Sequence, residues 1–257
     1  MTLINNKTYL FANWKMYLDY DESNILANAL AAAVKKFPKE IKMVVFPSAL
    51  SFYPVAQVLN DVKVDAGGQN AHWVDKGGYT GEVSVEMYKN AGAKYILVGH
   101  SERRHLFHET NHDIRQKMEA VLNAGLIPVL CVGETETERK DGKTEEVVEI
   151  QLRAALEDLK WPTGRELVVA YEPVWAIGTG NNCDPVEAER VQSKMADWIN
   201  GLVPGIIPAL LYGGSVRPEN VESYLVQPHV NGVLVGGASA KFDSWMEIIQ
   251  NSASIKA

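Results

Sequence analysis

Short apolar runs rich in β-branched residues alternate along the chain with longer stretches in which apolar residues recur every three or four positions. The first pattern is typical of buried strands, and the second is typical of amphipathic helices. Eight strands are predicted, at Tyr9–Asn13, Met43–Phe46, Val62–Ala66, Tyr95–Gly99, Ile127–Val132, Leu167–Glu172, Ala209–Gly213 and Gly232–Gly236. Helices are predicted after them, near Glu22–Lys36, Ser51–Leu59, Val83–Asn90, Asp113–Asn123, Thr144–Leu159, Pro185–Asn200, Pro218–Leu225 and Phe242–Ile249.

Strict alternation of strands and helices indicates parallel strands joined by right-handed crossovers. Eight such units in about 250 residues predict an α/β fold, a closed eight-stranded parallel (β/α)8 barrel. An open, doubly wound sheet is the alternative. Because no linker, low-complexity tract or internal repeat divides the sequence, residues 1–257 are expected to form a single domain.

The composition limits the possible functions. The chain has 257 residues, 46% hydrophobic and 22% charged, which is ordinary for a globular protein. Its net charge of −7 argues against binding to nucleic acid, and no run approaches the roughly 18 apolar residues of a membrane span. A polar amino terminus and two cysteines unsuited to a disulfide framework favour the cytoplasm. An anionic ligand would need a local positive field at its site.

Candidate chemistry gathers where the predicted strands end. The run Leu167–Glu172 is apolar until it stops at an acid followed by proline, and the carboxyl ends of all barrel strands share one mouth. Glu172 is therefore a candidate acid or base, although it could merely cap the next helix. The other polar residues and glycines expected at this mouth are Asn13, Lys15, Gln69, Asn70, His100, Glu102, Glu134, Gly213, Gly214, Ser215, Gly236 and Gly237.

The segment after Glu172 is unusual for a surface loop. Pro173, Val174, Trp175, Ala176, Ile177, Gly178 and Thr179 combine large apolar side chains with a flexible glycine. This combination favours a lid that closes over a site, and a loop that simply packs down is the alternative.

The glycine pairs Gly213-Gly214 and Gly236-Gly237 suit a phosphate group, because backbone N–H groups without side chains can approach an anion. They could also only form tight turns. Lys15 could neutralise an anion at the mouth or remain a surface lysine. His100 falls at the start of a short helical turn, where a helix N-terminus disfavours imidazolium, so it could act as a neutral hydrogen-bond donor.

Two further patterns compete with this interpretation. His108-Glu109-Thr110-Asn111-His112 matches the HExxH pattern of zinc peptidases, but Thr110 and Asn111 are typical helix-capping residues that would break the required helix. Cys131 could be a nucleophile, but its place in an apolar strand favours a buried packing role.

Five motifs resemble those of the triosephosphate isomerase family. They are Asn13-Trp14-Lys15, Val98–Arg104, Tyr171–Gly180, Tyr212–Val216 and Leu234–Ser239, and the similarity runs from end to end of the chain. The resemblance implies a TIM barrel that interconverts dihydroxyacetone phosphate and D-glyceraldehyde 3-phosphate in glycolysis and gluconeogenesis, without a cofactor or a metal. It further implies that Glu172 removes a proton to form an enediolate stabilised by His100, Lys15 and Asn13, with Glu102 as the supporting acid.

By the same resemblance, Gly178, Ser215, Gly236 and Gly237 hold the substrate phosphate. The third loop, Lys76–Glu82, is implied to insert into a second subunit, so that Tyr79 and Thr80 lie beside Asn13 and Met16 of that partner. A homodimer is therefore expected. A non-catalytic barrel that binds phosphorylated metabolites, and an aldolase that forms a Schiff base on Lys15, are the alternatives.

Some positions depart from the usual pattern of the family. Ala12 replaces a frequent glycine, Tyr17 replaces a common asparagine, and Asn181-Asn182-Cys183 occupies the carboxyl hinge of the lid. None of these positions is expected to touch the chemistry, and the last leaves the hinge kinetics open.

Overall fold

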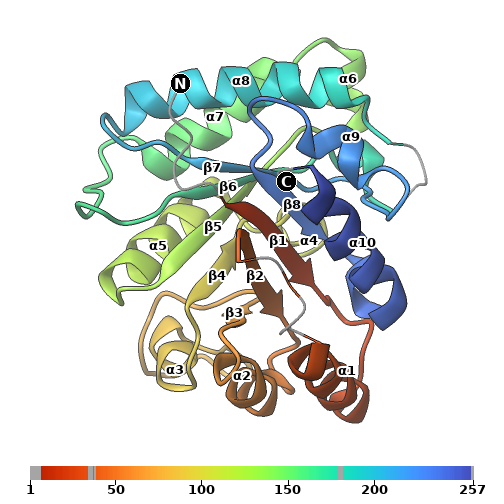
Figure 1. The fold of residues 1–257 in the computed structure, drawn as a ribbon. Helices are drawn as coiled ribbons and strands as arrows, with labels where there is room; N and C mark the ends of the chain where they lie inside the picture. Colours follow the sequence, from red (N-terminus) through yellow and green to blue (C-terminus); the bar gives the residue numbers. More distant parts are fainter. Residues whose placement is uncertain (1–6, 34–36, 38, 179–181, 256–257) are drawn as a thin grey trace.

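The computed structural model describes residues 7–33, 37, 39–178 and 182–255. Within that part, eight parallel strands form a closed barrel in the order in which they occur along the chain (Figure 1). The strands are β1 (Thr8–Asn13), β2 (Ile41–Phe46), β3 (Asp65–Gly68), β4 (Tyr95–Val98), β5 (Ile127–Val132), β6 (Val168–Tyr171), β7 (Ala209–Tyr212) and β8 (Gly232–Val235). The predicted barrel is confirmed, and the open sheet is excluded because β8 pairs with β1 through Leu10 and Val233.

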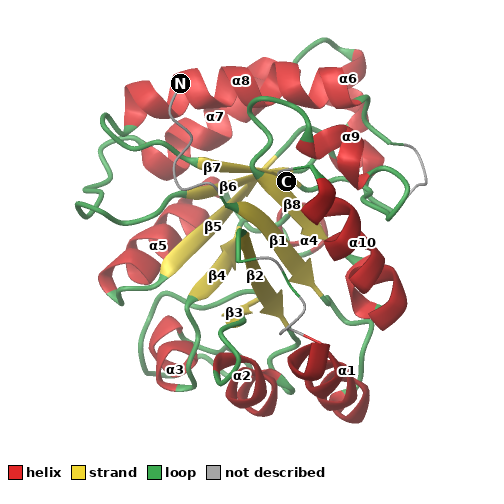
Figure 2. Cartoon of the chain, in the orientation of Figure 1, coloured by secondary structure: helices red, strands yellow, loops and turns green. Residues whose placement is uncertain are grey.

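Helices surround the strands on the outside (Figure 2). The α-helices are α1 (Tyr20–Ala33), α2 (Phe52–Asn60), α3 (Val85–Asn90), α4 (Ser101–Leu106), α5 (Asn111–Asn123), α6 (Glu136–Lys140), α7 (Thr144–Leu156), α8 (Pro185–Leu202), α9 (Val221–Leu225) and α10 (Phe242–Ser254). Two 3₁₀ helices, η2 (Val174–Ala176) and η3 (Gly237–Ala240), follow β6 and β8. No helix in the described ranges is long and apolar enough to cross a bilayer.

Side chains alternate between the inside and the outside of the barrel along each strand. In β1, Tyr9 and Phe11 belong to the apolar cluster that fills the barrel, whereas Leu10 and Ala12 pack in the layer beneath the helices. At the amino-terminal end of the barrel, Tyr95 donates a hydrogen bond of 3.0 Å to Glu166, and Tyr9 donates to the other oxygen of the same carboxylate. The barrel is therefore a filled core with a polar layer at its amino-terminal end.

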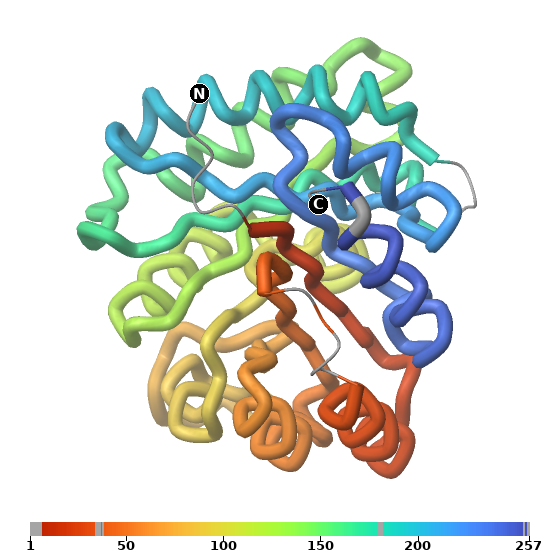
Figure 3. The backbone as a smooth tube through the Cα atoms, in the orientation of Figure 1, coloured from red at the N-terminus to blue at the C-terminus, as the bar shows by residue number. Residues whose placement is uncertain are grey.

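The ends of the fold meet. Figure 3 shows the first and last elements of the chain side by side, and β1 contacts both β8 and η3. The packing of β1 therefore depends on segments more than 200 residues away in sequence.

Several predicted boundaries are wrong. The third strand begins at Asp65, not Val62, because the chain first turns after α2, with Lys63 at a φ of +63°. The helix predicted from Pro218 begins only at Val221. The short helical turn expected at His100 is α4, whereas the short helix α6 after β5 was not predicted. Residues 34–36 of the first predicted helix lie outside the described residues.

Candidate active site

Glu172 and Asn13 stand at the mouth of the barrel because of strand alternation. Val168 and Ala170 of β6 face the interior, as do Tyr9 and Phe11 of β1. Two positions further on, the same alternation directs Glu172 and Asn13 inward at the carboxyl ends of their strands. Both side chains are buried there, and Glu172 is only 2% exposed.

Two of the glycines predicted at the mouth make room for these side chains. A Cβ atom on Gly213 would lie 2.8 Å from Cγ of Glu172, and one on Gly236 would lie 3.2 Å from Cε of Lys15. Neither glycine has a positive φ. The close approach of the Glu172 side chain, rather than a tight turn, therefore favours glycine at position 213, and a side chain at position 236 would have to displace the end of Lys15 slightly.

Glu172 is fixed by two neighbours at the start of α4, the N-cap residue His100 and the first helical residue Ser101. The backbone N–H of Ser101 donates to Oε2 of Glu172 at 2.8 Å, and Oε1 lies 3.2 Å from Nε2 of His100. These contacts join residues 71 positions or more apart in sequence. They place a buried carboxylate and an imidazole face to face.

His100 is the N-cap residue of α4. The backbone N–H of Glu102 donates to Nδ1 of His100 at 3.2 Å, so Nδ1 acts as an acceptor and the ring proton is assigned to Nε2. The Oε2 atom of Glu102 is 3.7 Å from Nδ1, too far for a hydrogen bond. The hydrogen-bond pattern is that of a neutral imidazole whose N–H points toward Glu172.

Lys15 is held in an unfavourable backbone conformation by its surroundings. Its φ is +49°, a region that side chains rarely adopt. The amide of Gln69 donates to its carbonyl oxygen at 2.8 Å, and its own N–H donates to Oδ1 of Asn13 at 3.1 Å. Its ammonium group pairs with Oε1 of Glu102 at 2.7 Å. Gln69, expected at the mouth without a role, thus supports the first loop.

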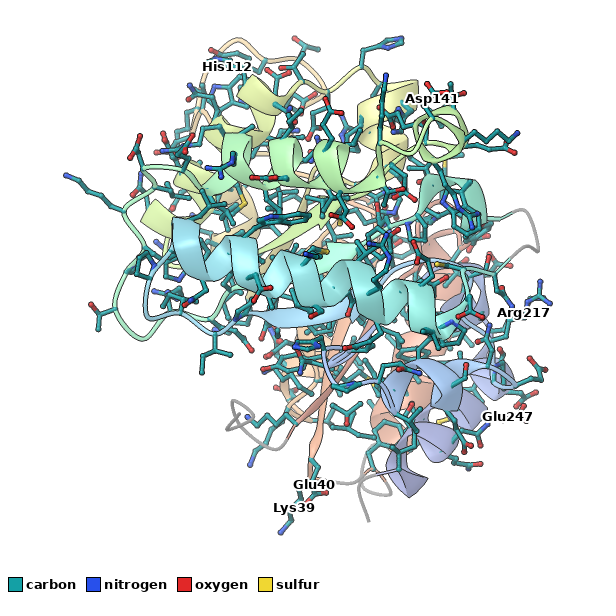
Figure 4. The ribbon with its side chains drawn as sticks, turned by 90° about the horizontal axis from the view of Figure 1, so that it is seen from above. Lys39, Glu40, His112, Asp141, Arg217 and Glu247 are labelled. Atoms are coloured by element: carbon teal, nitrogen blue, oxygen red, sulfur yellow. The ribbon has the colours of Figure 1, made fainter. Side chains whose placement is uncertain are left out.

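These groups line one cavity of about 320 Å³ at the mouth. Its walls include Asn13, Lys15, His100, Glu102 and Glu172, together with Ile177 and Gly178 of the loop after β6 and the glycine turns Gly213–Ser215 and Gly236–Gly237. Every site residue predicted at the mouth for substrate or phosphate therefore lies around one space. Arg217 stands at its rim, where Figure 4 shows its side chain extending away from the ribbon.

The predicted lid is anchored at its start. The indole N–H of Trp175 donates to Oε1 of Glu134 at 2.8 Å, the hydroxyl of Tyr171 donates to the same carboxylate, and the guanidinium of Arg139 lies 3.5 Å from the centre of the Trp175 ring. Burial raises the pKa of the Glu134 carboxyl above its usual value. Pro173 to Gly178 are described, with Ala176 buried and Gly178 at a φ of +70°, whereas Thr179 lies outside the described residues.

Glu134 is the main site residue to which the sequence analysis assigned no role. Its partner Trp175 is 41 residues away, so no local pattern connects them. The available signal was an acid directly after an apolar strand, the same signal that identified Glu172.

The HExxH pattern does not form a helical pentad. Thr110 is the N-cap of α5 and makes a capping box with Asp113, as expected, so His108 precedes the helix and has a φ of +55°. Glu109 accepts from Arg103 at 2.8 Å and from Lys117 at 2.6 Å. His112 is exposed at the edge of the molecule (Figure 4). Among the described residues, no three His, Cys, Asp or Glu side chains are placed to hold a metal ion.

Cys131 lies inside the barrel and is fully buried, which raises the pKa of its thiol well above the usual value. A thiol in this state is a poor nucleophile, in agreement with the packing role.

A second cavity, of about 420 Å³, is lined by Tyr79, Thr80, Arg103 and Lys117 among others. Its lining does not include Glu172 or His100.

Comparison with known proteins decides the family. The family model described as triosephosphate isomerase matches residues 8–252. A triosephosphate isomerase of Protochlamydia amoebophila is 39% identical over 246 residues, covering 95% of this chain and 92% of the relative. One of Dictyoglomus thermophilum is 40% identical over 243 residues, covering 93% and 97%. The chain belongs to the triosephosphate isomerase family.

One departure from the usual pattern of triosephosphate isomerases lies in the cavity. Tyr17 lines it, and its ring lies 3.5 Å from the point where a Cβ atom on Gly237 would stand. Tyr17 thus lies closer to the site than its place in the sequence indicates, and the expectation that it does not touch the chemistry stays a prediction. Of the hinge residues, Asn181 lies outside the described part, and Cys183 is fully buried.

Proposed function

We propose that this member of the triosephosphate isomerase family interconverts dihydroxyacetone phosphate and D-glyceraldehyde 3-phosphate through an enediolate, as a step of glycolysis and gluconeogenesis. The observation that carries the proposal is the 3.2 Å contact between the Glu172 carboxylate and Nε2 of His100, inside a cavity that also contains Lys15. A buried carboxylate beside a neutral N–H donor suits removal of a proton next to a carbonyl.

In the proposed mechanism, Glu172 takes a proton from the carbon next to the substrate carbonyl, and the carbonyl oxygen becomes negatively charged. The N–H of His100 and the amide of Asn13 donate hydrogen bonds to the enediolate oxygens. Glu172 then returns the proton to the neighbouring carbon, while the hydroxyl proton passes from one enediolate oxygen to the other, so that substrate and product contain the same atoms. Oε2 accepts from the N–H of Ser101 in this structure, which leaves Oε1, beside His100, as the oxygen that takes the proton.

Lys15 supplies the positive field that a protein with a net charge of −7 must provide locally. Its pairing with Glu102 at 2.7 Å supports a role for Glu102 as the acid that positions the ammonium group. The substrate phosphate would lie against the backbone N–H groups of Gly178, Ser215, Gly236 and Gly237, where no bulky side chain blocks its approach.

The segment Pro173–Thr179 would act as a lid over this cavity. Its described part reaches the phosphate turn, since the hydroxyl of Ser215 donates to the carbonyl oxygen of Ala176 at 2.7 Å. Closure would exclude water and keep the enediolate from expelling its phosphate. We place no cofactor and no metal in this mechanism.

We propose that the protein carries out this function as a homodimer. Met16, which follows Lys15, is 94% exposed, and an apolar side chain so exposed beside a catalytic lysine suggests a surface covered by a partner. We propose that Tyr79 and Thr80 of a second copy cover Asn13 and Met16.

Residues 1–257 are proposed as one domain working in the cytoplasm, where two unpaired buried cysteines are stable. Neither nucleic acid nor a membrane is proposed as a partner.

The test is a cofactor-free isomerisation assay with each of the two triose phosphates. The variant Glu172→Gln should lose at least about 1000-fold in kcat while it binds a phosphate-bearing inhibitor with similar affinity, because it loses the base and keeps the shape. Equal loss of inhibitor affinity would instead assign Glu172 a structural role. A non-catalytic binding barrel would show no turnover in the wild type.

A further inference from the structure

Two stacked tyrosines lie where the lid segment rejoins the barrel. Tyr212 ends β7 and Tyr224 belongs to α9, and their ring centroids are 3.9 Å apart with planes inclined by 12°. Both side chains are buried, and their hydroxyl oxygens are 3.3 Å apart. The pair forms a rigid block between a strand and a helix, because aromatic rings have few rotatable bonds.

This block holds Cys183. The hydroxyl of Tyr224 donates a hydrogen bond of 2.6 Å to the carbonyl oxygen of Cys183, and the Tyr224 ring is stacked on that of Tyr212. Cys183 is fully buried and directly precedes Asp184, the N-cap residue of α8. The point at which the lid ends is thus attached to α9 as well as to α8.

The same block lies against the proposed phosphate turn. A Cβ atom on Gly214 would stand 2.2 Å from the Tyr212 hydroxyl oxygen, so Gly214 packs directly on the tyrosine pair. The next residue, Ser215, donates to the carbonyl oxygen of Ala176 within the lid. The tyrosine pair is therefore in contact with the phosphate turn and with Cys183, in the carboxyl hinge of the lid.

We propose that Tyr224 is a positioning residue for the isomerisation, whose hydroxyl fixes the Cys183 carbonyl and thereby sets the carboxyl end of the lid relative to the phosphate turn. The inference rests on the proposed function. Without that hydroxyl, the buried carbonyl loses the short hydrogen bond from α9, and the local structure around Cys183 opens more often. A lid that closes less completely leaves the enediolate longer in contact with water.

The test compares Tyr224→Phe with Tyr95→Phe. Both changes remove one hydroxyl from a buried tyrosine, but the hydroxyl of Tyr95 bonds to Glu166 at the opposite end of the barrel. For Tyr224→Phe we expect kcat about tenfold lower and free phosphate released per isomerisation about tenfold higher, at a similar KM. Tyr95→Phe should leave the ratio of released phosphate to isomerised product unchanged. An unchanged ratio in Tyr224→Phe, or an equal rise in both variants, would overturn the proposal.

A second measurement does not depend on turnover. The chain has two cysteines, and both are buried, so alkylation by iodoacetamide, located by mass spectrometry, reports local opening at Cys183 with Cys131 as an internal control. We expect Cys183 to react about tenfold faster in Tyr224→Phe than in the wild type or in Tyr95→Phe. Equal alkylation rates at Cys183 in all three proteins would refute the proposal that the Tyr224 hydroxyl holds Cys183 in place. If the wild type lacks isomerase activity but Cys183 still reacts faster in Tyr224→Phe, the proposed function is refuted and the hold of Tyr224 on Cys183 stands.

Discussion

Glu172 is positioned at the mouth by neighbouring glycines, because these residues have no side chain. A Cβ atom on Gly133 would lie 1.8 Å from the carbonyl oxygen of Glu172, and one on Gly213 would lie 2.8 Å from its Cγ. The first glycine lets the backbone of β6 approach, and the second leaves space for the side chain of the proposed base. At this scale, the geometry of Glu172 depends on two positions that carry no chemistry.

The variant Gly213→Ala should therefore impair catalysis by displacing Glu172. We expect kcat to fall by about 100-fold, since a displacement of about 1 Å can cost that much, and stability to fall by about 1–3 kcal/mol. Steady-state kinetics and thermal unfolding measure the two effects. The control is Gly201→Ala, because nothing lies within 4 Å of a Cβ atom there. Full activity in Gly213→Ala would contradict this role of the glycine.

Lys15 permits a test between the isomerase and the Schiff-base aldolase. An aldolase lysine must present a free amine to the substrate carbonyl, but Nζ of Lys15 is engaged in an ion pair with Oε1 of Glu102 at 2.7 Å. Borohydride added with dihydroxyacetone phosphate should leave Lys15 unmodified, as mass spectrometry would show. Lys15→Met should weaken both binding and turnover, since it keeps the length and removes the charge. A reduced adduct on Lys15 would instead support the aldolase.

At the scale of elements, helix ends fix where the loops between strands begin and stop. Helix α5 starts with a capping box in which the Thr110 side chain accepts from the N–H of Asp113, and Asp113 accepts from the N–H of Thr110 at 2.9 Å. Hydrogen bonds from Thr110 hold the pKa of the Asp113 carboxyl below its usual value. The box stops the helix from extending back through Glu109, whose carboxylate is thereby available to Arg103 and Lys117.

Thr110→Ala should cost about 1 kcal/mol of unfolding free energy at neutral pH, the usual cost of losing such a cap. The pH dependence has a defined sign. A carboxyl with a lowered folded pKa stabilises the folded state above its unfolded pKa, near 4, and this contribution is lost as the pH falls through the folded pKa. The difference between the melting temperatures of the variant and the wild type should thus be larger at pH 7 than near pH 2, where only the bond from the Asp113 N–H to the Thr110 hydroxyl still contributes. A constant difference would show that Asp113 does not contribute.

The sequence predicted elements well where the signal was local, and poorly where it was not. Asp184 was recognised as a cap, and it accepts from the N–H of Val186 at 2.8 Å. The third strand was predicted to begin at Val62 because Val62 and Val64 are β-branched and apolar. In the structure these residues follow the end of α2 and precede the strand. The mouth residues were found because strand ends converge in a barrel. Contacts between distant segments, such as Trp175 with Glu134 or Tyr224 with Cys183, leave no periodic trace in the sequence.

At the scale of the whole molecule, the proposed site lies close to the surface proposed to join two copies. Lys15 lines the cavity, and the next residue, Met16, is the highly exposed side chain. A partner that covers Met16 would also stabilise the strained loop containing Lys15, so assembly and activity should be linked.

Thr80→Arg should disrupt the dimer, because it places a bulky charge on the loop proposed to enter the partner. Sedimentation should show monomers with poor activity. Glu86→Arg on α3 serves as a control for the added charge on a surface outside that loop. Fully active monomers of Thr80→Arg would separate assembly from catalysis and contradict the link.

The filled interior of the barrel limits how a hydrogen removed from the substrate can exchange with solvent deuterium. Below Glu172, the barrel is occupied by apolar side chains such as Phe11, Leu97 and Leu211, and the amino-terminal end is closed by the hydrogen bonds of Tyr9 and Tyr95 to Glu166. A proton held on Glu172 therefore can exchange with the solvent only through the mouth. In deuterium oxide, some of the product retains the hydrogen that Glu172 removed. The size of this fraction thus compares the time for which the mouth stays closed with the time that Glu172 needs to return the proton.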